Sequence, residues 1–144
     1  MVVPAADLTE LSTITEIAFI RAPMGEPSVM ISHLKVALGE ATADELVREF
    51  SSNLMAETSL KVVFSGTRFT AADNGAGRVI ITFNEPYEYN GGDFLIDLSY
   101  ADIEGSMYTM AWGPGSSRLM YSHGLRADRG NTSPLVPIIV VTGE

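Results

Sequence analysis

The chain has 144 residues and a formal charge of −9, with 18 acidic residues against nine basic ones. This charge argues against DNA, RNA and anionic membranes as partners, because binding to a polyanion depends on clustered lysine and arginine. The chain contains no cysteine, which excludes disulfides, thiolate metal sites and cysteine nucleophiles.

The length fits one domain spanning residues 1–144. Hydrophobic residues make up 46% of the chain and charged residues 19%, a composition typical of a packed globular protein. No apolar run reaches the roughly 18 residues of a membrane span. The first residues, MVVPAADL, lack the basic start and long apolar run of a signal peptide, so we expect either a cytoplasmic protein or an exported one whose leader was removed.

Short apolar segments that alternate with period two dominate the sequence, and Gly, Pro, Asn or Asp bound several of them. This pattern predicts an all-β domain, and we expect an antiparallel β-sandwich, jelly-roll-like, of about eight strands. The predicted strands lie at 14–21, 29–38, 60–65, 78–84, 94–100, 106–112, 118–123 and 135–142.

Alternation also predicts which side of a strand faces the core. In the strand at 94–100, Asp97 is expected to point outward, opposite Phe94 and Ile96. The strand at 29–38 divides in the same way. Its predicted core side holds Met30, Ser32, Leu34, Val36 and Leu38, and its outer side holds Ile31, His33 and Lys35.

One stretch, ATADELVREFSSN, departs from the period of two. Thr42 suits a helix N-cap, and Asp44 and Glu45 suit a first turn. Leu46, Val47 and Phe50 then fall on one helical face. The sequence therefore predicts one short helix near 43–50, about two turns long, at one end of the sandwich.

The stretch EYNGGDFLID at 88–97 fits two interpretations. Its oxygen-bearing side chains resemble the start of a calcium loop, but an apolar run separates Asp93 from Asp97, which breaks the ligand spacing of an EF-hand. The glycines at 91 and 92 permit the positive φ angles of a tight turn between two strand-forming runs. We therefore favour a β-hairpin.

Calcium stays open as a ligand of the acidic loops, where Asp73, Asn74, Asp93 and Asp128 would be the residues to bind it. The metal ligands are otherwise unknown, and no other cofactor is predicted.

The sequence predicts no catalytic residue, and we expect a protein that is not an enzyme. His33 falls on the outer face of a strand with no carboxylate beside it in sequence. His123 follows Ser122, but neighbouring residues of a strand point to opposite faces and do not form a nucleophile and base pair.

Aromatic residues are few, and alternation places Tyr108, Met110 and Trp112 on one side of a strand. We expect them to be buried or half-buried, as large aromatic side chains usually are. The alternative is that Tyr108 and Trp112, with Tyr121, Tyr87 and Tyr89, form an exposed platform that stacks on sugar rings.

A series of motifs in a fixed order covers nearly the whole chain. The motifs are ITEIAF (14–19), LKVALGEATADELVREFSSN (34–53), VVFSG (62–66), ITFNEPYEYNGGDFLIDLSY (81–100), SSRLMYS (116–122) and PLVPIIVV (134–141). This order resembles the β-sandwich modules of secreted and cell-surface bacterial proteins, which often carry C-terminal sorting or anchoring signals. Their PF-x-Y-x-GG-N-L-L-I-E hairpin is matched at 86–97, with Phe94 in place of the usual leucine.

The resemblance implies an extracellular or cell-surface module without catalysis and transfers no active-site residue. We expect a structural protein that self-associates as the building block of a surface layer, filament or adhesin. Its partners would be copies of itself, contacted through edge strands at the apolar terminal segments MVVPAADL and PLVPIIVVTG. The alternative function is a carbohydrate-binding module, with glycans as partners.

Overall fold

The computed structural model describes residues 1–8, 10–42, 46–54, 60–123 and 128–144. Within these ranges the chain forms β-strands and two single turns of 3₁₀-helix, at Ala5–Asp7 and Phe50–Asn53. The strands are β1 (Val2–Val3), β2 (Thr13–Gly25), β3 (Ser28–Glu40), β4 (Lys61–Ala72), β5 (Arg78–Glu88), β6 (Phe94–Ser99), β7 (Asp102–Glu104), β8 (Met107–Thr109), β9 (Ala111–Trp112), β10 (Leu119–Tyr121), β11 (Asn131–Ser133), β12 (Val136–Pro137) and β13 (Ile139–Gly143).

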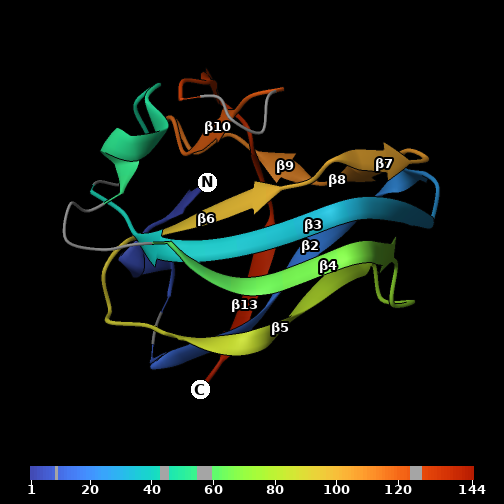
Figure 1. The fold of residues 1–144 in the computed structure, drawn as a ribbon, viewed down its shortest axis with the longest axis horizontal. Coiled ribbons are helices and arrows are strands. Elements are labelled where there is room, and N and C mark those ends of the chain that lie inside the picture. The colour runs from blue at the N-terminus through green and yellow to red at the C-terminus, as the bar shows by residue number, and fades with distance from the viewer. Residues whose placement is uncertain (9, 43–45, 55–59, 124–127) are drawn as a thin grey trace.

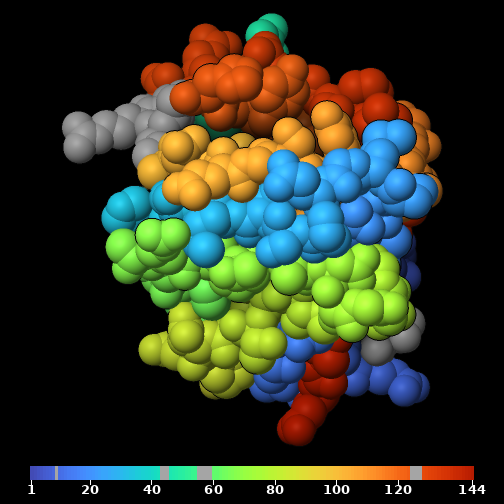
Figure 2. Space-filling model, turned by 90° about the vertical axis from the view of Figure 1, so that its right-hand side faces the viewer, coloured from blue at the N-terminus to red at the C-terminus, as the bar shows by residue number. Residues whose placement is uncertain are grey.

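These strands build two antiparallel sheets that pack face to face (Figure 1). One sheet has the strand order β1-β6-β3-β4, with β7 also paired to β3. The other has the order β13-β2-β5, with β8 also paired to β2. Two small ladders, β10 with β11 and β9 with β12, lie at the top of Figure 1. In the space-filling view of Figure 2, β3, β4 and β5 follow one another down one face as blue, green and yellow-green bands.

Side chains from both sheets share one core. β3 contributes Leu34 and Val36, and β6 contributes Phe94. β2 contributes Ile14 and Ile17 from the opposite sheet, and neither of these side chains reaches solvent. The all-β antiparallel sandwich predicted from the period of two is therefore confirmed.

Each of the eight predicted strands overlaps a strand of the structure, but two are interrupted. The segment 106–112 divides into β8 and β9 at Met110, and the segment 135–142 divides into β12 and β13 at Ile138. Both breaks lie where three segments meet. The Ile20 N–H donates to the Ile138 carbonyl (3.1 Å), the Met110 N–H to Ile20 (2.8 Å) and the Ile138 N–H to Met110 (2.8 Å). Each strand changes its partner at this junction.

The predicted faces of β3 are right for its second half and wrong for its first. Leu34 is buried, as expected, but Val29 and Ile31 pack inward in place of Met30 and Ser32. The reason is the backbone at His33, which has a φ of 52°. A left-handed residue shifts the alternation by one position, so the inward side changes from odd to even residues.

The short helix predicted near 43–50 is not formed in the part of it that the structure describes. Residues 43–45, which include Asp44 and Glu45, lie outside the described ranges. Residues 46–49 are not helical, and one 3₁₀ turn follows at Phe50–Asn53. Thr42 is not a cap: its hydroxyl donates to the Ser52 carbonyl at 3.1 Å.

The reason is that tertiary hydrogen bonds take the backbone groups that a helix would use. The Leu46 N–H donates to the Ser117 carbonyl (2.6 Å), and the Arg48 carbonyl accepts from the Gly130 N–H (2.8 Å). The buried side chain of Asn53 bonds both backbone groups of Val47. Local helix propensity is a weak preference that such contacts override.

The hairpin predicted at 88–97 is also wrong, although its turn is present. β5 pairs with β2 and β6 pairs with β3 and β1, so residues 89–93 connect the two sheets. Gly91 has the expected positive φ, at 85°. Asp97 is exposed, as predicted.

Tyr89 lies in the connection between the sheets, and its hydroxyl is buried without a hydrogen-bond partner among the described residues. Burial, and then the carboxylate of Asp93, raise the pKa of this hydroxyl. We expect Tyr89→Phe to stabilise the fold by about 1 kcal/mol, because it removes an unsatisfied polar atom and keeps the ring contact with Phe94. Urea denaturation measures the change, and Tyr121→Phe, on an exposed ring, is the control. A clear loss of stability in Tyr89→Phe would contradict the expectation.

Candidate functional site

A strip of exposed apolar side chains runs along β8 and β9. It consists of Met24, Tyr108, Met110, Trp112 and Leu135, and we call it the aromatic strip. The exposed fraction is 53% for Tyr108 and 46% for Trp112. The expectation that Tyr108, Met110 and Trp112 are buried or half-buried is therefore wrong, since all three side chains are exposed. Patches of this kind mark interaction sites on folded proteins.

The members of the aromatic strip are neighbours through the strand pairing. Gly25, next to Met24, pairs with Met107, next to Tyr108. At the other end Trp112 pairs with the buried Val136, and Leu135 lies across from Gly113. The strip is thus assembled from three separate parts of the sequence.

The same surface is the uncharged part of an acidic protein. Residues 105–117 and 130–143 are the two longest runs in the sequence without Asp, Glu, Lys or Arg. The pairing of β9 with β12 brings the two runs together. The segments that carry Tyr108, Met110, Trp112 and Leu135 are thus uncharged, and charge lies at the two ends of the strip, where Glu26 Oε1 accepts from the Ser106 N–H (3.1 Å) and Arg118 lies beside Trp112.

The backbone holds this surface in place. Met110, in the middle of the strip, uses both its N–H and its carbonyl in the junction with Ile20 and Ile138. Tyr108 lies against β2, where a Cβ at Gly25 would come within 2.9 Å of the tyrosine ring. Gly25 has a φ of 75° as well, so glycine is required at this position.

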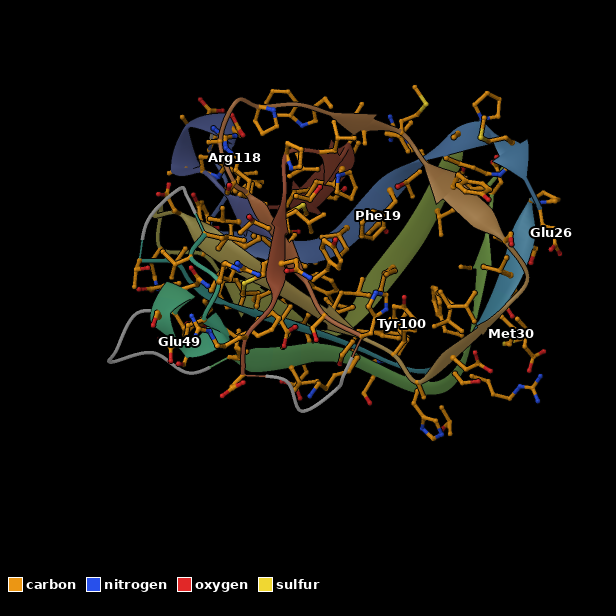
Figure 3. The ribbon with its side chains drawn as sticks, turned by 90° about the horizontal axis from the view of Figure 1, so that it is seen from above. Phe19, Glu26, Met30, Glu49, Tyr100 and Arg118 are labelled. Atoms are coloured by element: carbon orange, nitrogen blue, oxygen red, sulfur yellow. The ribbon has the colours of Figure 1, made fainter. Side chains whose placement is uncertain are left out.

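Trp112 is supported by an arginine on one side. The guanidinium carbon of Arg118 lies 5.9 Å from the centroid of the indole, within the range of a cation–π contact. Arg118 is itself fixed by Asp7 (Nη1 to Oδ2, 3.3 Å) and by the Ser116 hydroxyl (3.2 Å). Figure 3 shows Arg118 at one end of the molecule and Glu26 and Met30 at the other.

A cavity of about 240 Å³ adjoins Trp112 and Arg118, and the N-terminal segment and β12 line its walls. Next to it, the amine of Met1 donates to the Ile96 carbonyl at 2.8 Å. Burial lowers the pKa of this amine to about 6, against an opposing effect of the Asp97 carboxylate. The cavity places an apolar recess beside the exposed ring of Trp112.

The remaining aromatic residues do not join the strip as a single platform. Tyr87 is buried, and Tyr89 lies half-buried against Phe94. Tyr121 is exposed on β10 and lines a second, larger cavity. The predicted stacking set is therefore reduced to Tyr108 and Trp112, with Tyr121 at another site.

The histidines lie apart from the strip. His33 is exposed on β3, as predicted. His123 and Ser122 both line the cavity beside Tyr121, whose described lining contains no carboxylate.

The loop residues considered for calcium already have hydrogen-bond partners. Asp73 Oδ1 accepts from the N–H groups of Gly75 (2.8 Å) and Gly77 (3.0 Å), and Oδ2 pairs with Arg21 (3.4 Å). The hydrogen bond from the Gly75 N–H is the main cause that lowers the pKa of the Asp73 carboxyl, and the bond from Gly77 and the charge of Arg21 lower it further.

Side-chain oxygens of Asn74 and Asp93 also accept hydrogen bonds from backbone N–H groups. Asn74 Oδ1 accepts from Ala76 and Arg78, and Asp93 Oδ1 accepts from Ala5. Asp128 is exposed. Over the described ranges no group of three or more His, Asp or Glu side chains gathers to hold a metal ion.

No protein-family model matches this chain, and no match to it is found among curated proteins or solved structures. In the part of the chain that the structure describes, no helix is long and apolar enough to cross a membrane. The fold and the strip define a β-sandwich module with one uncharged, aromatic surface.

Proposed function

We propose that this chain is a non-enzymatic structural module that associates with copies of itself through the aromatic strip. The observation that carries the proposal is the exposure of Tyr108, Met110 and Trp112 on the uncharged segments of an acidic chain.

The charge of the chain favours this surface over any other for contact between copies. Two molecules of charge −9 repel one another. A contact through segments without carboxylates brings the fewest like charges together. Large aromatic residues and methionine, which form the strip, are also the residues enriched in protein interfaces.

The cavity beside Trp112 supports an isologous contact. Interface hot spots are anchors that fill a pocket on the partner. Leu135 is 54% exposed, and it lies next to the strand that pairs with Trp112. In a two-fold arrangement, Leu135 of each copy would enter the recess beside Trp112 of the other.

The terminal segments have partners within their own chain. β1 pairs with β6, and β13 pairs with β2. This pairing favours the strip over donated terminal strands as the contact between copies.

Sedimentation equilibrium over a range of protein concentrations tests the proposal. We expect the wild-type chain to associate reversibly and the double variant Tyr108→Ala/Trp112→Ala to weaken association by at least about 100-fold, because two hot-spot residues are removed. Association should strengthen with added salt, since salt screens the repulsion between like-charged copies.

The matched control is Tyr100→Ala/Val62→Ala, which removes an aromatic and an apolar side chain that are similarly exposed, at 42% and 46%, outside the strip. This control should associate like the wild type. A wild-type chain that stays monomeric at millimolar concentration, or a control that dissociates as much as the strip variant, would refute the proposal.

A carbohydrate-binding module is the second candidate, and the exposed rings of Tyr108 and Trp112 favour it. Three residues lie between Tyr108 and Trp112, which in extended backbone spans about 13 Å, so the two rings would stack on separate units of an oligosaccharide. Glycan-array binding that is lost in the strip variant, by a wild-type chain that remains monomeric, would select this function.

We assign the module to an extracellular or cell-surface setting on the resemblance of its motifs. In that setting, self-association would build a layer, filament or adhesin. A two-fold contact alone closes into a dimer, so growth beyond the dimer would use a second contact, for which β1 and β13 at the sheet edges are the candidates. Electron microscopy of the purified chain tests this step, with regular polymers as the expected result and discrete dimers as the result against it.

A further inference from the structure

The cavity beside β10 and β11 gathers positive charge on an acidic protein. It has a volume of about 440 Å³, within the range of small-molecule sites. Arg48, Arg129 and His123 line it, together with the ring of Tyr121 and the amide of Asn131. None of its described lining residues is a carboxylate, although the chain has twice as many acidic as basic residues.

The two arginines have no acidic partner among the described residues. The three ion pairs found there use Arg21, Lys61 and Arg118. Arg48 and Arg129 are next to Glu49 and Asp128 in sequence, but neither carboxylate lines the cavity, and Glu49 accepts from the Ser52 hydroxyl at 2.9 Å.

Neutral hydrogen-bond acceptors fix the position of the Arg48 side chain. Its Nε donates to the Gly130 carbonyl (3.2 Å), and Nη2 donates to Asn131 Oδ1 (2.8 Å). A guanidinium has five N–H donors, so Arg48 keeps donors for a ligand after these two bonds. A neutral acceptor fixes the side chain without cancelling its charge.

The cavity wall is built for close approach of two strands. A Cβ at Gly130 would come within 2.6 Å of the Tyr121 carbonyl and 2.9 Å of Met120 Cγ. Glycine therefore lets the segment that carries Arg129 and Asn131 lie against β10. The ring of Tyr121 stands edge-on to His123, with 6.2 Å between the ring centroids.

We propose that this cavity binds a small organic oxyanion, with its carboxylate or phosphate on Arg48 and Arg129 and its ring or carbon skeleton against Tyr121. The fork of a guanidinium matches both oxyanions. The site is separate from the aromatic strip and does not depend on self-association.

NMR titration of the full chain in phosphate-free buffer tests the site, with glucuronate, glucose 6-phosphate and glucose as probes. We expect saturable shifts centred on Arg48, Tyr121, Gly130 and Asn131 with the two anions and none with glucose. Tighter binding of glucose 6-phosphate would assign a phosphate ligand, and tighter binding of glucuronate a carboxylate.

Arg129→Gln should weaken anion binding by about tenfold or more, the usual effect of losing a charge-assisted hydrogen bond. Arg129 lies opposite Glu49 in an isolated backbone bridge, which glutamine keeps, and its side chain forms none of the ion pairs found among the described residues, so this variant should keep its stability. Arg68→Gln makes the same change of net charge on exposed β4 and should bind like the wild type.

Arg48→Gln provides a second variant and should lose binding as well. Equal losses in Arg68→Gln and Arg129→Gln, or shifts spread over the whole surface, would show general screening of charge and overturn the site. The strip variant Tyr108→Ala/Trp112→Ala should keep anion binding, which separates this test from that of self-association.

Discussion

Phe94→Ala is expected to lower the free energy of unfolding by about 3–5 kcal/mol, the largest effect of any single truncation in this chain. Phe94 is the largest of the fully buried side chains, with 1% of its surface exposed. It packs in the shared core, and the edge of its ring meets Tyr89 with 5.8 Å between the centroids. Its removal would leave a cavity between the two sheets.

Urea denaturation followed by circular dichroism, at one protein concentration, measures this loss. Phe94→Leu should cost only about 1–2 kcal/mol because it keeps much of the volume. Tyr100→Ala, on an exposed side chain, should change stability by about 0.5 kcal/mol or less. Equal losses for Phe94→Ala and Tyr100→Ala would contradict the placement of Phe94 in the core.

The sequence predicts the sandwich well because most strands bury one face. In both sheets one face packs against the shared core, so apolar and polar residues alternate along the strand, as in the second half of β3. The error in the first half arises at His33, a left-handed residue in the middle of an apolar strand pattern, where histidine adopts a positive φ more often than most residues but still uncommonly. Only glycine makes a positive φ predictable from sequence.

The partner of a strand is harder to predict than its existence. The turn at 90–93 has the residues of a hairpin, yet β5 and β6 belong to different sheets. Turn chemistry fixes the local bend, while pairing depends on which long strand offers a free edge. The junction at Ile20, Met110 and Ile138 shows the same dependence, since three distant segments exchange partners there.

The aromatic strip was visible in the sequence in part. Alternation grouped Tyr108, Met110 and Trp112, all of which are exposed, but burial was assigned from the usual behaviour of large side chains. The signal against burial was the lack of charge in 105–117 and 130–143, which marks a surface that does not need charged residues. The cavity at Arg48 and Arg129 gave no such signal, because 82 residues of sequence separate Arg48 from Gly130 and only the fold joins them.

Asn53→Ala is expected to cost about 3 kcal/mol, because three backbone groups lose their only side-chain partner. Asn53 is 3% exposed. Its Oδ1 accepts from the Val47 N–H at 2.8 Å, and its Nδ2 donates to the carbonyls of Val47 and Glu49, both at 2.9 Å. These bonds hold residues 47–49 outside a helix. Alanine would remove the bonds to both backbone groups of Val47, while the Glu49 carbonyl would keep its bond from the Ser52 N–H (3.3 Å).

Asn53→Asp separates hydrogen bonding from packing, since the two side chains have nearly the same shape. At pH 7 a carboxylate would face the two carbonyls that Nδ2 now contacts, so we expect a larger loss than for alanine. Burial would hold the pKa of this new carboxyl above the unfolded value of about 3.9, and the unfolded state would then release its proton first as the pH rises. The loss of stability in Asn53→Asp should therefore become smaller as the pH falls from 7 to 4.

Asn53→Ala should also affect the oxyanion site, because Asn53 positions the backbone on both sides of Arg48. We expect Asn53→Ala to weaken binding of the anionic probes in the folded protein, as Arg48→Gln does, while Phe94→Leu, which also lowers stability, leaves binding unchanged. If both variants bound the probes like the wild type, residues 47–49 would not need Asn53 to present Arg48. Loss of binding in Asn53→Ala alone would show that a buried amide sets the geometry of a charged surface site.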